Sequence, residues 1–135
     1  MDPEVSTLFD GANYASVASL MPDGSPHSVT VWTGLQDGDR PSFFTQTTSQ
    51  KAKNLERDPR VAISIIDHDN PYNTARVRGT VVEKRYGEDA FDAINAISHK
   101  YTGEDFPMLG PNSVLFVVEP AKVSHMKLPF EHKPG

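Results

Sequence analysis

Short strand-like segments separated by tight turns make up most of this chain and most restrict its fold. Turn sequences rich in proline, aspartate and glycine at residues 21–26 and 37–39 should join the early segments as hairpins. No regular alternation of strand and helix appears, so a parallel doubly wound sheet is disfavoured. We predict a mainly β fold of about six antiparallel strands, closed as a small barrel, which removes exposed edges. The predicted strand segments are residues 14–20, 27–34, 42–45, 61–66, 74–84, 113–118 and 121–126.

Two of these segments carry a further expectation. Residues 61–66 are apolar almost throughout, which predicts a central strand. Gly79 lies inside the segment 74–84 and indicates a bulge or a close approach of another backbone. Glu119 and Pro120 separate the last two segments, so we expect them to be distinct strands.

Short helices are expected at the N-terminus, in the middle and near the end of the chain. Asp2 and Pro3 resemble a helix cap and first helical position. Residues 87–101 form the clearest helix pattern, which Gly103 ends. Its apolar residues recur at spacings of three and four, as expected for one helix face: Phe91, Ile94, Ile97 and Tyr101.

Composition limits the classes of function. A length of 135 residues suits one domain, residues 1–135, with a single core. The net charge of −5 argues against a nucleic-acid or anionic-membrane surface. The absence of cysteine excludes disulfides, zinc ribbons, iron–sulfur ligation and thiol nucleophiles, and is compatible with a cytoplasmic enzyme. No membrane-length apolar run or signal-peptide pattern is present.

The stretch 45–60 combines a hydroxyl-rich turn with a short basic helix that Asp58 and Pro59 should end. Lys51 and Lys53 fall in the first helical turn, where they oppose the helix dipole. An external anion, such as a phosphate, would explain cations at that position. The alternative is a solvated turn followed by a charged surface helix.

Catalytic and metal-binding patterns are missing. The histidines lack metal-ligand spacing, no carboxylate pair stands out, and neither a GxGxxG nor a P-loop motif is present. We therefore predict no catalytic side chain and no metal site, and expect that a cofactor carries any chemistry. Trp32 is either a packing residue or a surface for a flat ligand. Arg76 and Arg78 either face solvent or point into the site of Lys51.

Several short motifs follow one another along the chain: Gly-Ser-Pro-His at 24–27, Val-Trp at 31–32, Phe-Thr at 44–45, Ser-Gln-Lys-Ala at 49–52, Asn-Leu at 54–55, Asp-Pro-Arg at 58–60, Pro-Tyr at 71–72, Val-Arg-Gly at 77–79, and the segments 100–107 and 117–123. In their order and spacing they resemble the pyridoxamine 5′-phosphate oxidase-like split β-barrel superfamily. The chain looks more closely like the flavin/deazaflavin oxidoreductases of its B group, the F-420-dependent enzymes of actinobacteria.

The resemblance implies a six-stranded split barrel that forms a homodimer, with the cofactor at the subunit interface in contact with both subunits. It implies that Ser49, Gln50 and Lys51 hold the cofactor phosphate, above a turn lined by Thr45 and Thr47. The ring system would lie along the strand at 29–32, and Thr74 and Arg76 would approach the same pocket. The full set of implied cofactor-binding residues is Val29, Thr30, Val31, Trp32, Thr45, Thr47, Ser49, Gln50, Lys51, Lys53, Asn54, Thr74 and Arg76.

Two departures from the oxidase proper direct the functional expectation. The oxidase has arginine at the positions of Val29 and Gln50, and its C-terminal substrate-binding segment carries tryptophan and arginine that residues 126–135 lack. Pyridoxamine oxidation is therefore disfavoured, and spread positive charge suits the acidic tail of coenzyme F-420. The expected function is hydride transfer from F-420H2 to an electron-poor double bond of a small molecule. The alternatives are an FMN flavoprotein of the same fold and a non-catalytic cofactor binder.

Overall fold

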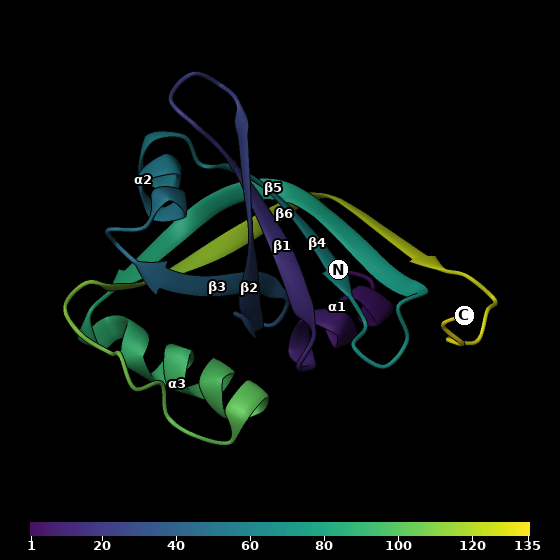
Figure 1. The fold of residues 1–135 in the computed structure, drawn as a ribbon. Coiled ribbons are helices and arrows are strands. Elements are labelled where there is room, and N and C mark those ends of the chain that lie inside the picture. Colours follow the sequence, from purple (N-terminus) through teal and green to yellow (C-terminus); the bar gives the residue numbers. More distant parts are fainter.

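The computed structural model describes residues 1–135 and consists of six strands and three short helices (Figure 1). Asp2 caps the first helix by accepting the backbone N–H of Glu4, and Pro3 is its first residue, as predicted. In chain order the elements are α1 (Pro3–Asp10), β1 (Tyr14–Leu20), β2 (Pro26–Gln36), β3 (Arg40–Gln46), α2 (Gln50–Arg57), β4 (Arg60–Ile66), β5 (Asn73–Tyr86), α3 (Glu88–Thr102) and β6 (Ser113–Lys127).

The strands close into one antiparallel barrel in the order β1-β2-β3-β6-β5-β4, which confirms the predicted fold class. One boundary prediction was wrong, because β6 runs continuously through Glu119 and Pro120. The register with β5 shifts at Arg78 and Gly79, and Pro120 lies opposite Gly79. A proline without an N–H is accommodated in a strand at such a bulge.

Gly79 is the close-approach position that the sequence indicated. A Cβ atom built on Gly79 would lie 2.1 Å from the backbone oxygen of Glu119. Only glycine allows β5 and β6 to approach this closely at the bulge.

The barrel is split, because β2 changes its partner along its length and β6 loses one of its two partners. β2 pairs with β1 over residues 26–32, and with β3 only from Thr33 to Gln36. β6 pairs with β3 over residues 113–117, whereas its remaining half pairs with β5 alone. The first half of β2 and the second half of β6 therefore each keep one edge without a strand partner.

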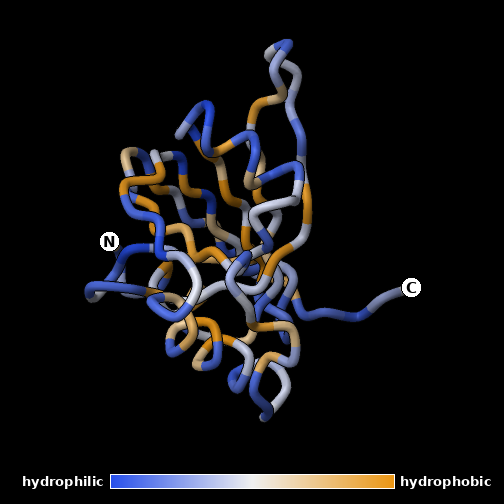
Figure 2. The backbone as a smooth tube through the Cα atoms, turned by 90° about the vertical axis from the view of Figure 1, so that its left-hand side faces the viewer, coloured by the Kyte–Doolittle hydropathy of each residue, from blue (hydrophilic) through white to orange (hydrophobic).

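The main core fills the barrel and is closed by α1 and α2. Val5, Leu8 and Phe9 of α1 and Ala52 and Leu55 of α2 belong to one buried cluster with the inward side chains of the strands. Apolar and polar residues alternate along many strand segments (Figure 2).

The strand β4 is central, as its apolar sequence predicted, because β1 and β5 pair with its two edges, but only one of its faces is buried. Val61, Ile63 and Ile65 are buried, whereas Ser64 and Ile66 are exposed on the outer face of the barrel. The period-2 alternation of a one-sided strand was hidden by apolar residues on both faces.

The helix α3 packs outside the barrel and makes a second, smaller core. Ile94 and Ile97 lie against Leu115 and Val117 of β6. Gly103 ends α3 in the left-handed conformation at φ 77°, as the glycine there predicted. None of the three helices is long and apolar enough to cross a membrane.

Candidate functional site

The start of α2 offers several hydrogen-bond donors to an anion. Ser49 caps the helix, because its Oγ accepts the N–H of Ala52 at 3.2 Å, and the Thr45 hydroxyl donates to that same Oγ at 3.0 Å. The backbone N–H groups of Gln50 and Lys51 have no acceptor in the protein. Free N–H groups at a helix start attract negative charge.

The ammonium of Lys51 has no ion-pair partner. Its side chain is half-buried, and burial lowers the pKa of Lys51 from its ordinary value. Lys53 is exposed and also lies beyond ion-pair distance of every carboxylate. A partly desolvated cation without a counter-ion is costly, and an arriving anion would relieve that cost.

The other two basic residues of this stretch are already engaged. Arg60 pairs with Asp58 at 2.7 Å, and its side-chain hydrogen bonds lower the pKa of Asp58 to about 2. Arg57 donates to the backbone oxygen of Leu20 and to Asn54 Oδ1. Of the basic run, Lys51 and Lys53 therefore remain free for a ligand.

Asn54 is fully buried and joins α2 to the barrel. Its Nδ2 donates to Ser19 Oγ at 3.1 Å, and its Oδ1 accepts from Gln50 Nε2 at 2.9 Å and from Arg57. The structure thus places Asn54 beneath the helix, where it positions α2, and ties the amide of Gln50 to it. The bond between Asn54 and Ser19 was not predicted, because the two residues lie 35 positions apart in the sequence.

One edge of β2 has no strand partner over residues 26–32 and presents free backbone groups. The bond from Met21 N–H to the Ser25 oxygen closes the β1–β2 hairpin and sets its hydrogen-bond alternation. By that alternation, Ser28, Thr30 and Trp32 direct their N–H and C=O groups away from β1. They point to the edge that β3 does not cover.

The side chains of residues 29–32 divide between the two faces of the sheet. Val31 is buried in the barrel and Val29 packs against the same core, whereas Thr30 is exposed. Trp32 stacks on Tyr101 at 5.0 Å between ring centroids and 7° between planes. The simpler interpretation of Trp32 as a packing residue therefore describes its ring, while its backbone remains available.

The Tyr101 hydroxyl accepts the N–H of Thr33 and donates to the oxygen of Asn13, which fixes α3 against β1 and β2. Next to it, Lys100 donates to the backbone oxygens of Phe9 and Thr33. Burial lowers the pKa of Lys100 to about 8. The helical pattern placed Tyr101 on the inner face of α3, but its polar partners lie on other elements.

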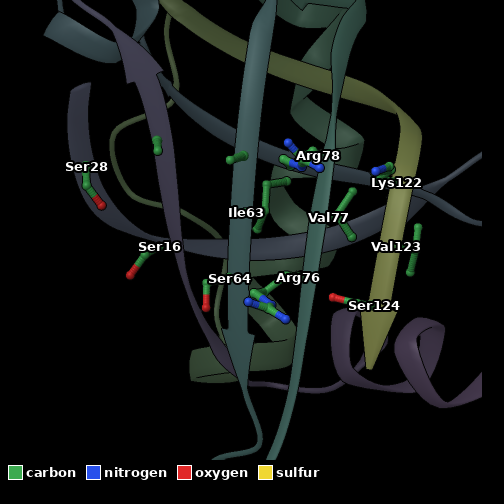
Figure 3. Close-up of a pocket in the computed structure, with 12 residues that line it drawn as sticks. Ser16, Ser28, Ile63, Ser64, Arg76, Val77, Arg78, Lys122, Val123 and Ser124 are labelled. Carbon is green, nitrogen blue, oxygen red and sulfur yellow. The ribbon is translucent and has the colours of Figure 1, made fainter. Parts of the chain in front are cut away.

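A groove of about 720 Å³ runs over the outer face of β1, β4, β5 and β6 (Figure 3). Arg76, Arg78 and Lys122 line it with no carboxylate within ion-pair distance. Small polar side chains fill the space beside them, and Figure 3 shows Ser64 close to Arg76.

The structure places the predicted site residues Thr74 and Arg76 apart from those at the start of α2. Arg76 pairs across the sheet with Ser64, which pairs with Ser16 of β1. By contrast, α2 attaches at Leu20, about 13 Å further along β1 at the usual rise of a strand. Thr74 and Arg76 form one group, and the start of α2 forms the other, while Ser28 of β2 lines the same groove as Arg76.

No group of three or more histidine or acidic side chains lies close enough to hold a metal ion. The geometry thus defines a split-barrel protein with a helix start suited to an anion. The family model for pyridoxamine 5′-phosphate oxidase matches residues 1–127, and the chain therefore belongs to this family.

Solved structures agree with this assignment. An F420 reductase is 30% identical, with a TM-score of 0.77 over 88% of this chain and 94% of that chain. A conserved hypothetical protein from Mycobacterium tuberculosis is 23% identical, with a TM-score of 0.81 over 100% and 92% of the two chains. A pyridoxamine 5′-phosphate oxidase-related, FMN-binding protein from Nostoc punctiforme is 21% identical, with a TM-score of 0.67 over 89% and 77%. Curated proteins gave no match.

Proposed function

We propose that this protein is a homodimeric reductase that uses reduced coenzyme F-420 to transfer a hydride to an electron-poor double bond of a small organic substrate. The observation that carries the proposal is the half-buried, unpaired Lys51 beside the free N–H groups that begin α2. This set of donors fits a phosphate diester, because each is positive or hydrogen-bonding and none is already satisfied. Thr45, Thr47 and Ser49 add hydroxyl groups around the same turn.

The choice of F-420 over FMN rests on the density of positive charge. Gln50 stands where the oxidase proper has arginine, and its amide is tied to Asn54. Val29, the second such position, packs towards the barrel core. Lys51 and the exposed Lys53 leave a spread charge that suits a monoanionic diester followed by an acidic tail. The 30% identity to an F420 reductase supports the same choice.

FMN is the second candidate, favoured by the structural likeness to an FMN-binding protein of 21% identity. The two cofactors present a similar fused ring, for which the free backbone groups of Thr30 and Trp32 supply donors and acceptors. A comparison of FMN and F-420 binding to the same preparation decides between them. Tighter binding of FMN would reverse the assignment.

When bound, reduced F-420 supplies the hydride. The chain's own contribution is to hold the phosphate with Lys51, to align the ring along the edge of β2, and to keep water from the reacting face. No side chain is assigned as a proton donor, since solvent can protonate the product. A non-catalytic binder is distinguished by turnover, because it would bind F-420H2 without oxidising it in the presence of any acceptor.

The homodimer is proposed because Thr74 and Arg76 lie far from α2 within one chain. A second subunit would bring its Arg76 to the first subunit's Lys51, so that each site uses residues of both. Subunit mixing tests this. We expect Lys51→Ala and Arg76→Ala chains each to bind the cofactor weakly. In a mixed dimer of the two variants, one shared site carries both substitutions and the other carries neither, so half of the sites should bind normally. Unchanged weak binding after mixing would contradict a shared site.

Cofactor binding can be followed through the fluorescence of Trp32, the only tryptophan. F-420 should quench it saturably, and Lys51→Ala should weaken binding about tenfold or more, the cost of losing one charge-assisted contact. Lys133→Ala is the matched control, since Lys133 lies in the exposed tail and pairs with Glu131. Equal affinity of the wild type and Lys51→Ala would show that the phosphate does not bind at α2.

A further inference from the structure

A small apolar pocket lies where the segment between α3 and β6 passes the end of β3 (Figure 1). Its volume is about 360 Å³. The pocket is lined by two aromatic rings, one methionine and two polar side chains: Phe44, Thr45, Gln46, Phe106 and Met108.

The walls of this pocket are held in place by several contacts. Phe106 meets Phe44 edge to face at 4.9 Å between centroids and 74° between planes, and its N–H donates to Asn95 Oδ1 at 3.0 Å. Gln46 Nε2 donates to the backbone oxygen of Met108 at 3.3 Å. The Thr47 N–H donates to the oxygen of Asn112 at 2.8 Å. The pocket is thus largely formed before any ligand arrives.

The lining selects the charge and shape of an occupant. No charged side chain lines the pocket, so a carboxylate or ammonium would lose its hydration there without compensation. Aromatic edges and a thioether pack well against a flat ring. Met108 is 64% exposed, and an occupant of the pocket would cover part of its side chain. Gln46 Oε1 has no partner and can accept one hydrogen bond.

The pocket also adjoins the proposed cofactor site. Thr45 is a member of both, because its hydroxyl donates to Ser49 at the cap of α2. Phe44 and Phe106 lie edge to face against Trp32, whose backbone borders the free edge of β2. A molecule in the pocket would therefore lie beside a ring aligned on that edge.

We propose that this pocket binds the hydride acceptor, and that it selects uncharged molecules in which a flat apolar ring is conjugated to a carbonyl group, with Met108 as a specificity-determining residue. This inference rests on the proposed function. The overall change adds a hydride to the β carbon of the enone and a proton from solvent to the α carbon. The product is the saturated ketone, and the reduced deazaflavin is oxidised by two electrons.

A matched pair of probes tests the pocket without cofactor. Benzylideneacetone and cinnamate share one phenylpropenyl skeleton, but the first is a neutral ketone and the second a carboxylate. In protein labelled with ¹³C at the methionine methyl groups, benzylideneacetone should shift the Met108 resonance saturably. The Met126 methyl group, 51% exposed on another face, is the internal control. The affinity of cinnamate for the pocket should be lower than that of benzylideneacetone by a factor of about ten or more.

Substitution completes the binding test. Met108→Ala should weaken benzylideneacetone binding about fivefold, through lost apolar contact. Val82→Ala removes a comparably exposed apolar side chain, 52% accessible, from a distant part of β5 and should change nothing. Equal shifts at Met108 and Met126, equal affinity for the two probes, or unchanged binding by Met108→Ala would each overturn the pocket assignment.

Turnover separates this inference from the proposed function. With F-420H2 present, benzylideneacetone should be reduced faster than cinnamate, and Met108→Ala should raise KM with little change in kcat. If F-420 binds but neither probe shifts Met108, the pocket assignment fails alone. If benzylideneacetone shifts Met108 but F-420 does not bind, the proposed function fails alone.

Discussion

Replacing Asn54 with alanine tests whether one buried amide holds α2, and with it the candidate anion site, against the barrel. Asn54 is fully buried. Its side chain bonds to Ser19 Oγ at 3.1 Å, to Gln50 Nε2 at 2.9 Å and to Arg57 at 3.3 Å. The substitution removes all of these partners at once and leaves the Ser19 hydroxyl, in a side chain only 2% exposed, without its bond.

The expected loss follows from these contacts. Each neutral hydrogen bond contributes about 0.5–1.5 kcal/mol, and a buried polar group left unsatisfied costs about 1–3 kcal/mol. The higher helix propensity of alanine offsets about 0.5 kcal/mol of this loss. We therefore expect Asn54→Ala to lower the free energy of unfolding by about 2–4 kcal/mol.

Urea denaturation followed by Trp32 fluorescence measures this loss, provided that the m-value is unchanged. Lys53→Ala on the same helix is the control, since Lys53 is exposed, and it should change stability by about 0.5 kcal/mol or less. A double-mutant cycle with Ser19→Ala should give a coupling energy of about 1 kcal/mol. A loss below about 1 kcal/mol for Asn54→Ala would refute the reasoning, since the network would then contribute no more than one ordinary bond.

Three further predictions concern the barrel and its outer helix. Gly79→Ala should lower the free energy of unfolding by about 1–3 kcal/mol, because the new Cβ would lie 2.1 Å from the Glu119 oxygen. Gly110 has open space around it, so Gly110→Ala is the control and should leave the thermal melt almost unchanged. Burial lowers the pKa of Lys100 to about 8, so the folded state loses this proton before the unfolded state does. The free energy of unfolding should therefore increase with pH between about pH 8 and the ordinary pKa of lysine. Urea titrations at several pH values should show this increase for the wild type and not for Lys100→Met. Tyr101→Phe should lower the free energy of unfolding by about 1–3 kcal/mol, because the Thr33 N–H loses its acceptor. The phenylalanine ring can still stack on Trp32, so the Trp32 emission should not change. An unchanged midpoint of urea denaturation would contradict this role of the hydroxyl.

Features determined by local chemistry could be predicted from the sequence. The Asp2 and Pro3 helix start depends only on neighbouring residues, as does the end of α2 at Asp58. Gly79 marked the close approach of two strands, because no other residue tolerates it. The closed barrel followed from the spacing of turns and strands, and the family resemblance agreed with it.

Features that depend on distant partners could not be predicted. The bulge that carries Pro120 through β6 requires β5 opposite it. Asn54 was expected among the cofactor-binding residues, and only the structure shows that it is fully buried and bonded to Ser19. The cations of β5 and β6 gather on one groove because of the strand register, in which Arg78 lies beside Lys122. Sequence spacing alone does not encode that register.

The position of β6 between β3 and β5 also determines when the molecule can fold. The pairing of Phe43 with Phe116 closes the barrel, and β6 is the last strand of the chain. Until β6 leaves the ribosome, β3 and β5 each have an unpaired edge, and much of the core stays open to water. We therefore expect the nascent chain to remain protease-sensitive, and dependent on chaperones that cover strand edges, until β6 has emerged from the ribosome.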